Sequence, residues 1–187
     1  MPIGVLALQG DVREHIHLLA ELGSDAVEVR TADQLSTCDA LVIPGGESTT
    51  ISKLLVNFGL MDPVQNFVSS KPVLGTCAGL ILLSEEVVGR LPDQHLIGGL
   101  PTAVERNAYG GQTHSFEAEV DFTGVSETVA FIRAPRIIDF QDCEVIARLG
   151  NDPVAIRYEN VFGATFHPEL TGAKELHKQF LSAVEGA

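Results

Sequence analysis

The sequence predicts an α/β fold with three layers, in which helices flank a mostly parallel central sheet that is extended by antiparallel strands. In the first half of the chain, short continuous apolar segments alternate with segments of helical periodicity, which is typical of parallel strands covered on both faces. In the second half, strand-like segments follow one another, and several alternate between apolar and polar residues as antiparallel strands do.

The first half of the chain consists of strand–helix units. Residues 3–8 form an apolar run, and residues 12–22 then place apolar side chains at helical spacing. Further strands are expected at Ala26–Val29, Ala40–Ile43 and Val73–Thr76, and further helices at residues 49–58 and 78–84. In such a fold, the turns at the carboxyl edge of the sheet hold the ligand.

The second half is predicted to be mostly antiparallel and to end in a helix. Strands are expected at residues 102–106, 115–120, 128–132, 144–149, 154–158 and 161–166, with a hairpin turn at residues 158–161. Residues 173–184 have the apolar spacing of an amphipathic helix. Because no linker, repeat or low-complexity tract interrupts the chain, we expect residues 1–187 to form a single domain.

Composition disfavours several classes of partner. The 187 residues include 12 Lys and Arg against 25 Asp and Glu, a formal net charge of −13, which disfavours binding to nucleic acid or to an acidic membrane surface. No apolar run approaches the roughly 18–20 residues of a membrane span. The three cysteines, Cys38, Cys77 and Cys143, are odd in number and lack zinc-site spacing, so we expect a cytoplasmic protein without a metal or other cofactor.

The first motif follows the strand at Val73–Thr76. Residues 75–79, Gly-Thr-Cys-Ala-Gly, have the form G-x-C-x-G, the cysteine version of a nucleophile elbow, in which small residues let the chain reverse sharply. The turn would expose the Cys77 thiol at a helix N-terminus, where the helix dipole favours the reactive thiolate. Taken alone, the motif fits equally well a buried turn that is packed by small residues.

The second motif is Phe166-His167-Pro168-Glu169, at the end of a predicted strand. In extended backbone, residues two apart share a face, so His167 and Glu169 would project to one side while Pro168 stiffens the bend. A base beside the group that orients it is what an activated nucleophile requires. Isolated His-x-Glu pairs are also common on protein surfaces.

The third motif is the strand-to-helix turn at residues 43–50, Ile-Pro-Gly-Gly-Glu-Ser-Thr-Thr. Its paired glycines allow backbone N–H groups to point into a cavity, an arrangement that suits an oxyanion. A phosphate-binding loop is disfavoured because no Lys follows Gly46 until Lys53. All three motifs end predicted strands and can therefore meet at one edge of the sheet, and their combination is far more specific than any one of them.

With these motifs, the sequence strongly resembles the class I (triad) glutamine amidotransferases, and among them the glutaminase subunits of pyridoxal 5′-phosphate synthases. The Cys and His-Pro-Glu motifs are shared with amidotransferases in general, whereas Gly-Glu-Ser-Thr-Thr and Ile-Arg-Ala-Pro point to the narrower group. The matching segments include residues 4–10, 44–50, 75–80, 131–135 and 166–171.

The resemblance implies a flavodoxin-like amidotransferase fold and hydrolysis of L-glutamine to glutamate and ammonia. Cys77 would form a γ-glutamyl thioester, His167 would shuttle protons and Glu169 would orient His167. Backbone N–H groups near Gly46 and Ala78 would form the oxyanion hole, and a barrel-type synthase subunit would be the partner that receives ammonia. The residues implied to bind glutamine are Gly46, Glu47, Ser48, Arg106, Ile132 and Arg133.

The sequence departs from the family at Gly111 and His114, which replace an Arg and an Asp of most relatives. Two rival interpretations are another cysteine hydrolase with the same elbow, and a catalytically idle binding module that keeps the fold. Arg106 and Ile132-Arg133 favour an amino-acid substrate, and the complete set of Cys77, His167 and Glu169 disfavours the idle module. His95 and His177 are expected to meet solvent.

Overall fold

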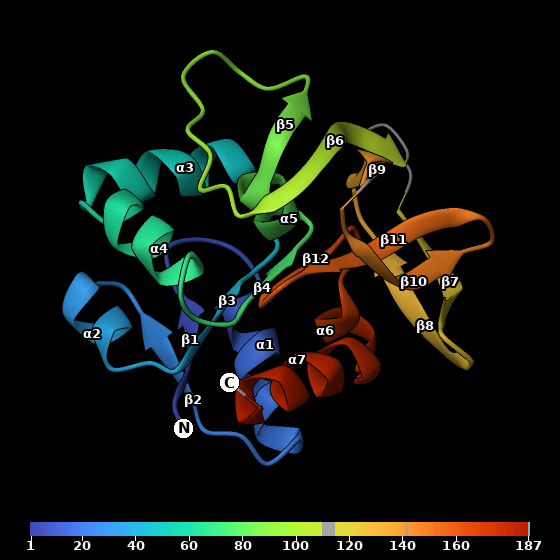
Figure 1. Cartoon of the computed structure of the whole chain (residues 1–187), viewed down its shortest axis with the longest axis horizontal. Coiled ribbons are helices and arrows are strands. Elements are labelled where there is room, and N and C mark those ends of the chain that lie inside the picture. Colours follow the sequence, from blue (N-terminus) through green and yellow to red (C-terminus); the bar gives the residue numbers. More distant parts are fainter. Residues whose placement is uncertain (110–114, 141, 187) are drawn as a thin grey trace.

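The computed structural model describes residues 1–109, 115–140 and 142–186, and the strands of these residues form two sheets (Figure 1). The larger sheet has nine strands among the described residues, five parallel at one end and four antiparallel at the other. Its order is β2 (Ala26–Val29), β1 (Ile3–Leu6), β3 (Ala40–Ile43), β4 (Val73–Thr76), β12 (Val161–Ala164), β11 (Asp152–Tyr158), β10 (Glu144–Leu149), β7 (Phe116–Phe122) and β8 (Val125–Phe131).

The smaller sheet packs against β11 and β12, where the larger sheet changes from parallel to antiparallel pairing. Within the described part of the chain it has three strands, in the order β5 (Ser84–Val88), β6 (Leu100–Tyr109) and β9 (Ala134–Asp139). Strand β5 runs parallel to β6, and β6 runs antiparallel to β9. Only two residues, Ile132 and Arg133, separate β8 from β9, so the chain passes directly from the larger sheet to the smaller one through them.

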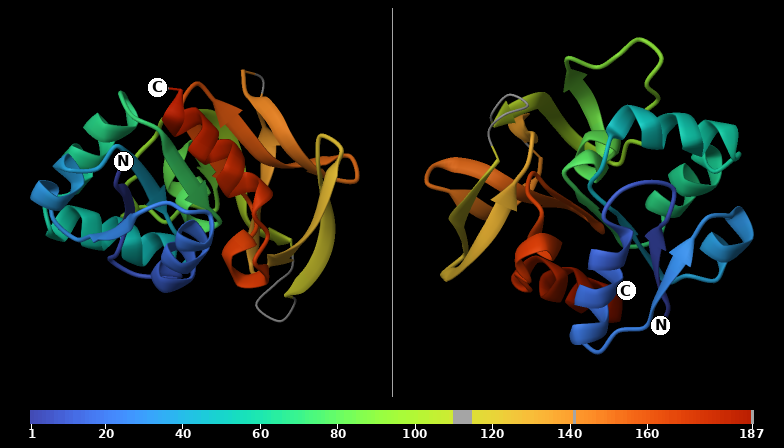
Figure 2. Two further views of the ribbon diagram at one scale, coloured as in Figure 1. Left: turned by 90° about the horizontal axis from the view of Figure 1, so that it is seen from below. Right: turned by 180° about the vertical axis from the view of Figure 1, so that it is seen from behind.

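Helices cover both faces of the parallel strands (Figures 1 and 2). One face carries α1 (Val12–Glu21), α6 (Pro168–Thr171) and α7 (Glu175–Glu185), and the other carries α2 (Ala32–Ser36), α3 (Ser48–Asn57), α4 (Met61–Val68) and α5 (Ala78–Leu83). No helix among the described residues is long and apolar enough to cross a membrane.

Strand alternation divides the apolar core between these two faces. On β3, Leu41 and Ile43 belong to the cluster that includes the buried side of α3, whereas Val42 belongs to the cluster that includes Leu19 of α1 and Phe180 of α7. Because every side chain of β3 is buried, its sequence is continuously apolar rather than alternating. This arrangement confirms the predicted three-layer α/β fold.

Several element boundaries differ from the sequence-based expectation. The strand expected at residues 161–166 ends at Ala164, because His167 begins a helical turn with Pro168 at its first position, where proline is favoured. Helices α2, α4 and α6 and strands β5 and β9 were not predicted. Helix α2 had a recognisable signal, since Thr31 and Gln34 form a capping box.

Candidate active site

The carboxyl ends of β1, β3, β4 and β12 meet around a cavity of about 430 Å³, within the size range of small-molecule sites. The three sequence motifs contribute to it together, as their positions after strands predict. Eight of the expected site residues line the cavity, namely Gly46, Glu47, Ser48, Cys77, Arg106, Ile132, Arg133 and His167. Glu169 and Ala78 are buried behind this lining.

Cys77 occupies the sharp turn between β4 and α5. Its backbone has φ 47° and ψ −97°, a conformation that costs a non-glycine residue energy and is held here by surrounding structure. Gly79 permits the turn, since a Cβ there would lie 2.1 Å from the Ile43 carbonyl oxygen. The Cys77 N–H donates to the Ala164 carbonyl at 2.8 Å, and its Sγ lies 3.8 Å from the Ile132 carbonyl oxygen.

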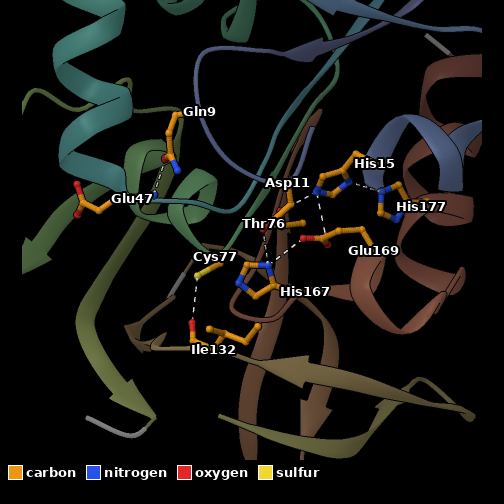
Figure 3. Close-up of polar contacts among 10 residues, drawn as sticks. All are labelled: Gln9, Asp11, His15, Glu47, Thr76, Cys77, Ile132, His167, Glu169 and His177. Atoms are coloured by element: carbon orange, nitrogen blue, oxygen red, sulfur yellow. Dashed lines mark hydrogen bonds and ion pairs between the residues drawn. The ribbon is translucent and has the colours of Figure 1, made fainter. Parts of the chain in front are cut away.

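His167 is held at the junction of β12 and α6 (Figure 3). Its N–H donates to the Ala130 carbonyl at 2.8 Å, which ties it to β8. Its Nδ1 lies 2.8 Å from Glu169 Oε1 and 3.2 Å from Asp11 Oδ2. Glu169 reaches His167 from the first turn of α6, and not from the extended backbone that the sequence predicted.

These contacts surround the His167 imidazole with groups that stabilise its protonated form. Burial by itself lowers the pKa of His167, but hydrogen bonds to Asp11, Cys77 and Glu169 outweigh it and raise that pKa to about 12. Burial raises the pKa of Glu169, against the opposing effect of His167. An imidazolium at His167 is therefore stabilised next to the thiol, which is the charge state that accompanies a cysteine thiolate.

Two backbone segments border the position in front of Cys77. Ala78 is the first residue of α5, so its N–H has no acceptor within the helix. In the turn after β3, the Glu47 N–H donates to Gln9 Oε1 at 2.7 Å, and a Cβ on Gly46 would lie 2.5 Å from the same oxygen. The turn after β3 is thus tied to the loop after β1.

The wall of the cavity formed by Arg106 and Glu47 is polar. Arg106 Nη2 lies 3.2 Å from Glu47 Oε1, while the other Glu47 oxygen accepts from the Thr50 N–H at 2.8 Å and from the Thr49 hydroxyl. Burial opposes ionisation of Glu47, but the hydrogen bonds from Thr49 and Thr50 lower its pKa. Ser48 is 2% exposed, and its Oγ has no hydrogen-bond partner among the described residues.

The family model of the SNO glutamine amidotransferase family matches residues 5–186. The chain belongs to this family. A relative from Frankia alni, named pyridoxal 5′-phosphate synthase subunit PdxT, is 49% identical over 190 residues, and the match covers 99% of this chain and 96% of the relative. A relative of the same name from Streptomyces griseus is 49% identical over 187 residues, covering 97% of this chain and 95% of the relative.

A solved structure described as a glutamine amidotransferase agrees with this assignment. It has 46% sequence identity and a TM-score of 0.91, and the match covers 98% of both chains. The resemblance to the glutamine amidotransferases that the three motifs indicated is therefore confirmed. Gly111 and His114, where the sequence departs from the family pattern, lie outside the described residues.

Sequence reasoning missed several polar residues around this amidotransferase site. The largest error concerns His177, which was expected in solvent but is fully buried. It lies on the same face of α7 as Phe180 and Val184, at helical spacing, and this periodicity was the available signal. His15 is likewise buried, on α1, whereas its neighbour His17 is exposed.

Asp11 adds a second carboxylate to the site. Donor atoms of Asp11, His167 and Glu169 all lie within 4.8 Å of one another, a spacing that could also suit a cation. The same donor atoms are engaged in the short contacts from His167 to the two carboxylates. We therefore interpret the three residues as a hydrogen-bonded cluster that serves the imidazole.

Proposed function

We propose that this glutamine amidotransferase hydrolyses L-glutamine to L-glutamate and ammonia through Cys77, His167 and Glu169. The observation that carries the proposal is the convergence of the elbow cysteine and the His167–Glu169 pair, 2.8 Å apart, at one small cavity. A nucleophile, a base and the carboxylate that orients the base are the components of an acyl-transfer site.

In the proposed reaction, the Cys77 thiolate attacks the side-chain carboxamide carbon of glutamine and forms a tetrahedral oxyanion. The C–N bond then breaks, and His167 supplies the proton with which nitrogen leaves as ammonia. The remaining γ-glutamyl thioester is attacked by water, whose proton passes to His167. Cleavage of the C–S bond releases glutamate and restores the thiolate.

Charge on the oxyanion would be stabilised by backbone N–H groups at Ala78 and near Gly46. Arg106 and Arg133, which line the same cavity, suit the α-carboxylate of the substrate. The unpartnered Oγ of Ser48 and the backbone of Gly46, Glu47 and Ile132 complete the proposed glutamine contacts.

We further propose that the ammonia is delivered to a barrel-type synthase subunit that makes pyridoxal 5′-phosphate from a pentose phosphate and a triose phosphate. This part of the proposal is supported by the name shared by the full-length relatives at 49% identity. The protein would then act as the glutaminase subunit of a hetero-oligomer.

Two measurements test the proposal. Acid quenching during turnover should trap a γ-glutamyl adduct on the peptide that contains Cys77, detected by mass spectrometry. With the synthase subunit and both sugar phosphates present, glutamine labelled with ¹⁵N in its amide should place the label in pyridoxal 5′-phosphate. Unlabelled product under these conditions would contradict the partner assignment, and turnover without an adduct at Cys77 would contradict the covalent mechanism.

A further inference from the structure

A buried polar chain continues behind Glu169, on the side away from the cavity (Figure 3). His15 Nε2 lies 3.4 Å from Glu169 Oε2 and 3.0 Å from Thr76 Oγ1, and His15 Nδ1 lies 3.0 Å from His177 Nε2. His15, Thr76 and His177 are each fully buried, and they come from α1, β4 and α7. Three elements that are distant in sequence thus meet at His15, which in turn contacts the carboxylate.

The partners of His15 indicate which ring nitrogens of His15 and His177 carry hydrogen. An ionised Glu169 can only accept, and the Thr76 hydroxyl, 3.0 Å from the same nitrogen, can accept as well as donate. We therefore assign the proton of His15 to Nε2, which faces both oxygens. In a neutral imidazole the other nitrogen, Nδ1, is then an acceptor, and His177 must donate to it from Nε2. Burial keeps both rings neutral, because it lowers the pKa of His15 well below the usual value and that of His177 to about 3.

Among the described residues, His15 is the side-chain donor that lies near Glu169 Oε2 on the side away from the cavity. Oε1 is taken by His167, whereas Oε2 is buried and has no partner with hydrogen-bond geometry among the described residues. A buried carboxylate oxygen without a donor is costly, and contacts of catalytic groups that are long in a free enzyme commonly shorten in its substrate complex. The 3.4 Å contact from His15 is positioned to close in this way.

We propose that His15, supported by His177, is a positioning residue that keeps Glu169 ionised and directed at His167. The inference rests on the proposed function, because it assumes that Glu169 orients the catalytic base. The charged and titratable groups around the carboxylate are then His167 and Asp11 on the cavity side and His15, backed by His177, on the far side. A site that needed only packing would be filled at lower cost by apolar side chains.

The test compares His15→Leu, which removes the donor, with His15→Gln, whose amide nitrogen can take the place of Nε2. His17→Leu is the matched control, since His17 is exposed two residues along the same helix. Glutamine hydrolysis is measured against pH with the synthase subunit present. In parallel, the rate at which iodoacetamide alkylates Cys77 in the isolated chain is followed by peptide mass spectrometry.

For His15→Leu we expect kcat to fall by about fivefold to a hundredfold, the range for loss of a donor to a buried acceptor, with KM nearly unchanged. The acid limb of the kcat profile and the pH dependence of Cys77 alkylation should both move to higher pH, because Glu169 then protonates more readily. His15→Gln should recover most of kcat, and His17→Leu should match the wild type. A purely structural role for His15 would leave both pH profiles in place.

Two further variants separate the possible failures. If His15→Leu does not fold, His177→Leu replaces it, since it removes the donor that fixes the His15 tautomer and should shift the same two pH profiles. Unshifted profiles in a folded His15 or His177 variant would overturn the inference. Glu169→Gln, measured alongside, tests the proposed function itself. Wild-type kinetics of Glu169→Gln would overturn the triad. An impaired Glu169→Gln together with wild-type kinetics and pH profiles of His15→Leu would overturn only the proposed role of His15.

Discussion

Gly45 lies directly against the imidazole of His167: a Cβ on Gly45 would be 2.3 Å from Cε1 and 2.7 Å from Nδ1. Real Cβ atoms essentially never approach another heavy atom so closely. The ring cannot move away from Gly45 without disturbing the contact between Nδ1 and Glu169, which is 2.8 Å long. The turn after β3 and the proposed catalytic base are therefore fitted to each other, and a glycine is required where they meet.

Gly45→Ala should consequently displace His167 and reduce kcat by roughly a hundredfold, the scale of loss for a misplacement of about 1 Å in a catalytic geometry. Steady-state glutaminase assays measure the effect, and circular dichroism tests whether the fold persists. Gly186→Ala is the matched control, since a Cβ there meets its nearest atom at 3.5 Å. Equal kcat in the two variants would show that His167 tolerates movement.

Cys77→Ala should abolish glutamine turnover and leave the fold intact, because a methyl group fits a turn that already holds a cysteine. Cys38→Ala and Cys143→Ala should retain activity. Burial raises the pKa of Cys38 and raises that of Cys143 to about 11, so neither thiol is a ready nucleophile near neutral pH. Alkylation by a glutamine analogue should therefore map to Cys77 alone, and turnover above a few per cent of wild type in Cys77→Ala would exclude it as the nucleophile.

Glu169→Gln should reduce kcat less than His167→Ala does. The amide oxygen of Gln can still accept from His167 Nδ1, but the negative charge that favours the imidazolium is lost. Side-by-side kcat measurements decide the order. Equal losses would indicate a direct or structural role for Glu169, and an unchanged kcat would remove it from the mechanism.

Strand positions and the three motifs could be predicted because they depend on local sequence. Buried parallel strands must be apolar throughout, and sharp turns at their ends need small residues, so the positions of Cys77 and His167 followed from the spacing of those signals. The groups that surround Glu169 could not be predicted. His15, Thr76 and His177 meet only through tertiary packing of three elements. The periodicity of α7 marks His177 as buried, but no local pattern shows that the three side chains contact one another.

The two buried neutral histidines should make stability depend on pH. Burial lowers the pKa of His177 from 6.5 to about 3, so below pH 6.5 the unfolded chain binds a proton there that the folded chain does not, and stability falls as pH decreases. His15 acts in the same direction. Well below pH 6.5, His167 is protonated in both states and contributes no slope.

His177→Leu should therefore flatten the decline of the unfolding free energy between about pH 6.5 and pH 5, by up to ~1.4 kcal/mol per pH unit. Urea denaturation at several pH values measures the slope, which is independent of any constant change in stability that the substitution causes. His17→Leu, at an exposed position, should keep the wild-type slope. A wild-type slope in His177→Leu would mean that His177 is not held neutral.

The isolated chain should be a poor glutaminase, and adding the barrel-type synthase subunit should raise its kcat by roughly a hundredfold to a thousandfold. That range is the typical effect of one oxyanion-hole donor. The Glu47 N–H is already engaged by Gln9 Oε1 at 2.7 Å, so this turn must rearrange before it can offer that donor to a substrate oxyanion. The glycines at residues 45 and 46 allow one peptide to reorient when the partner docks.

Steady-state assays with and without the synthase subunit test this, with the Cys77→Ala chain plus synthase subunit as the background. A rise in kcat at nearly constant KM would support the idea that the synthase subunit completes the oxyanion hole, which acts only in the transition state. Equal rates with and without the synthase subunit would contradict this activation and leave the assignment of Cys77, His167 and Glu169 unaffected.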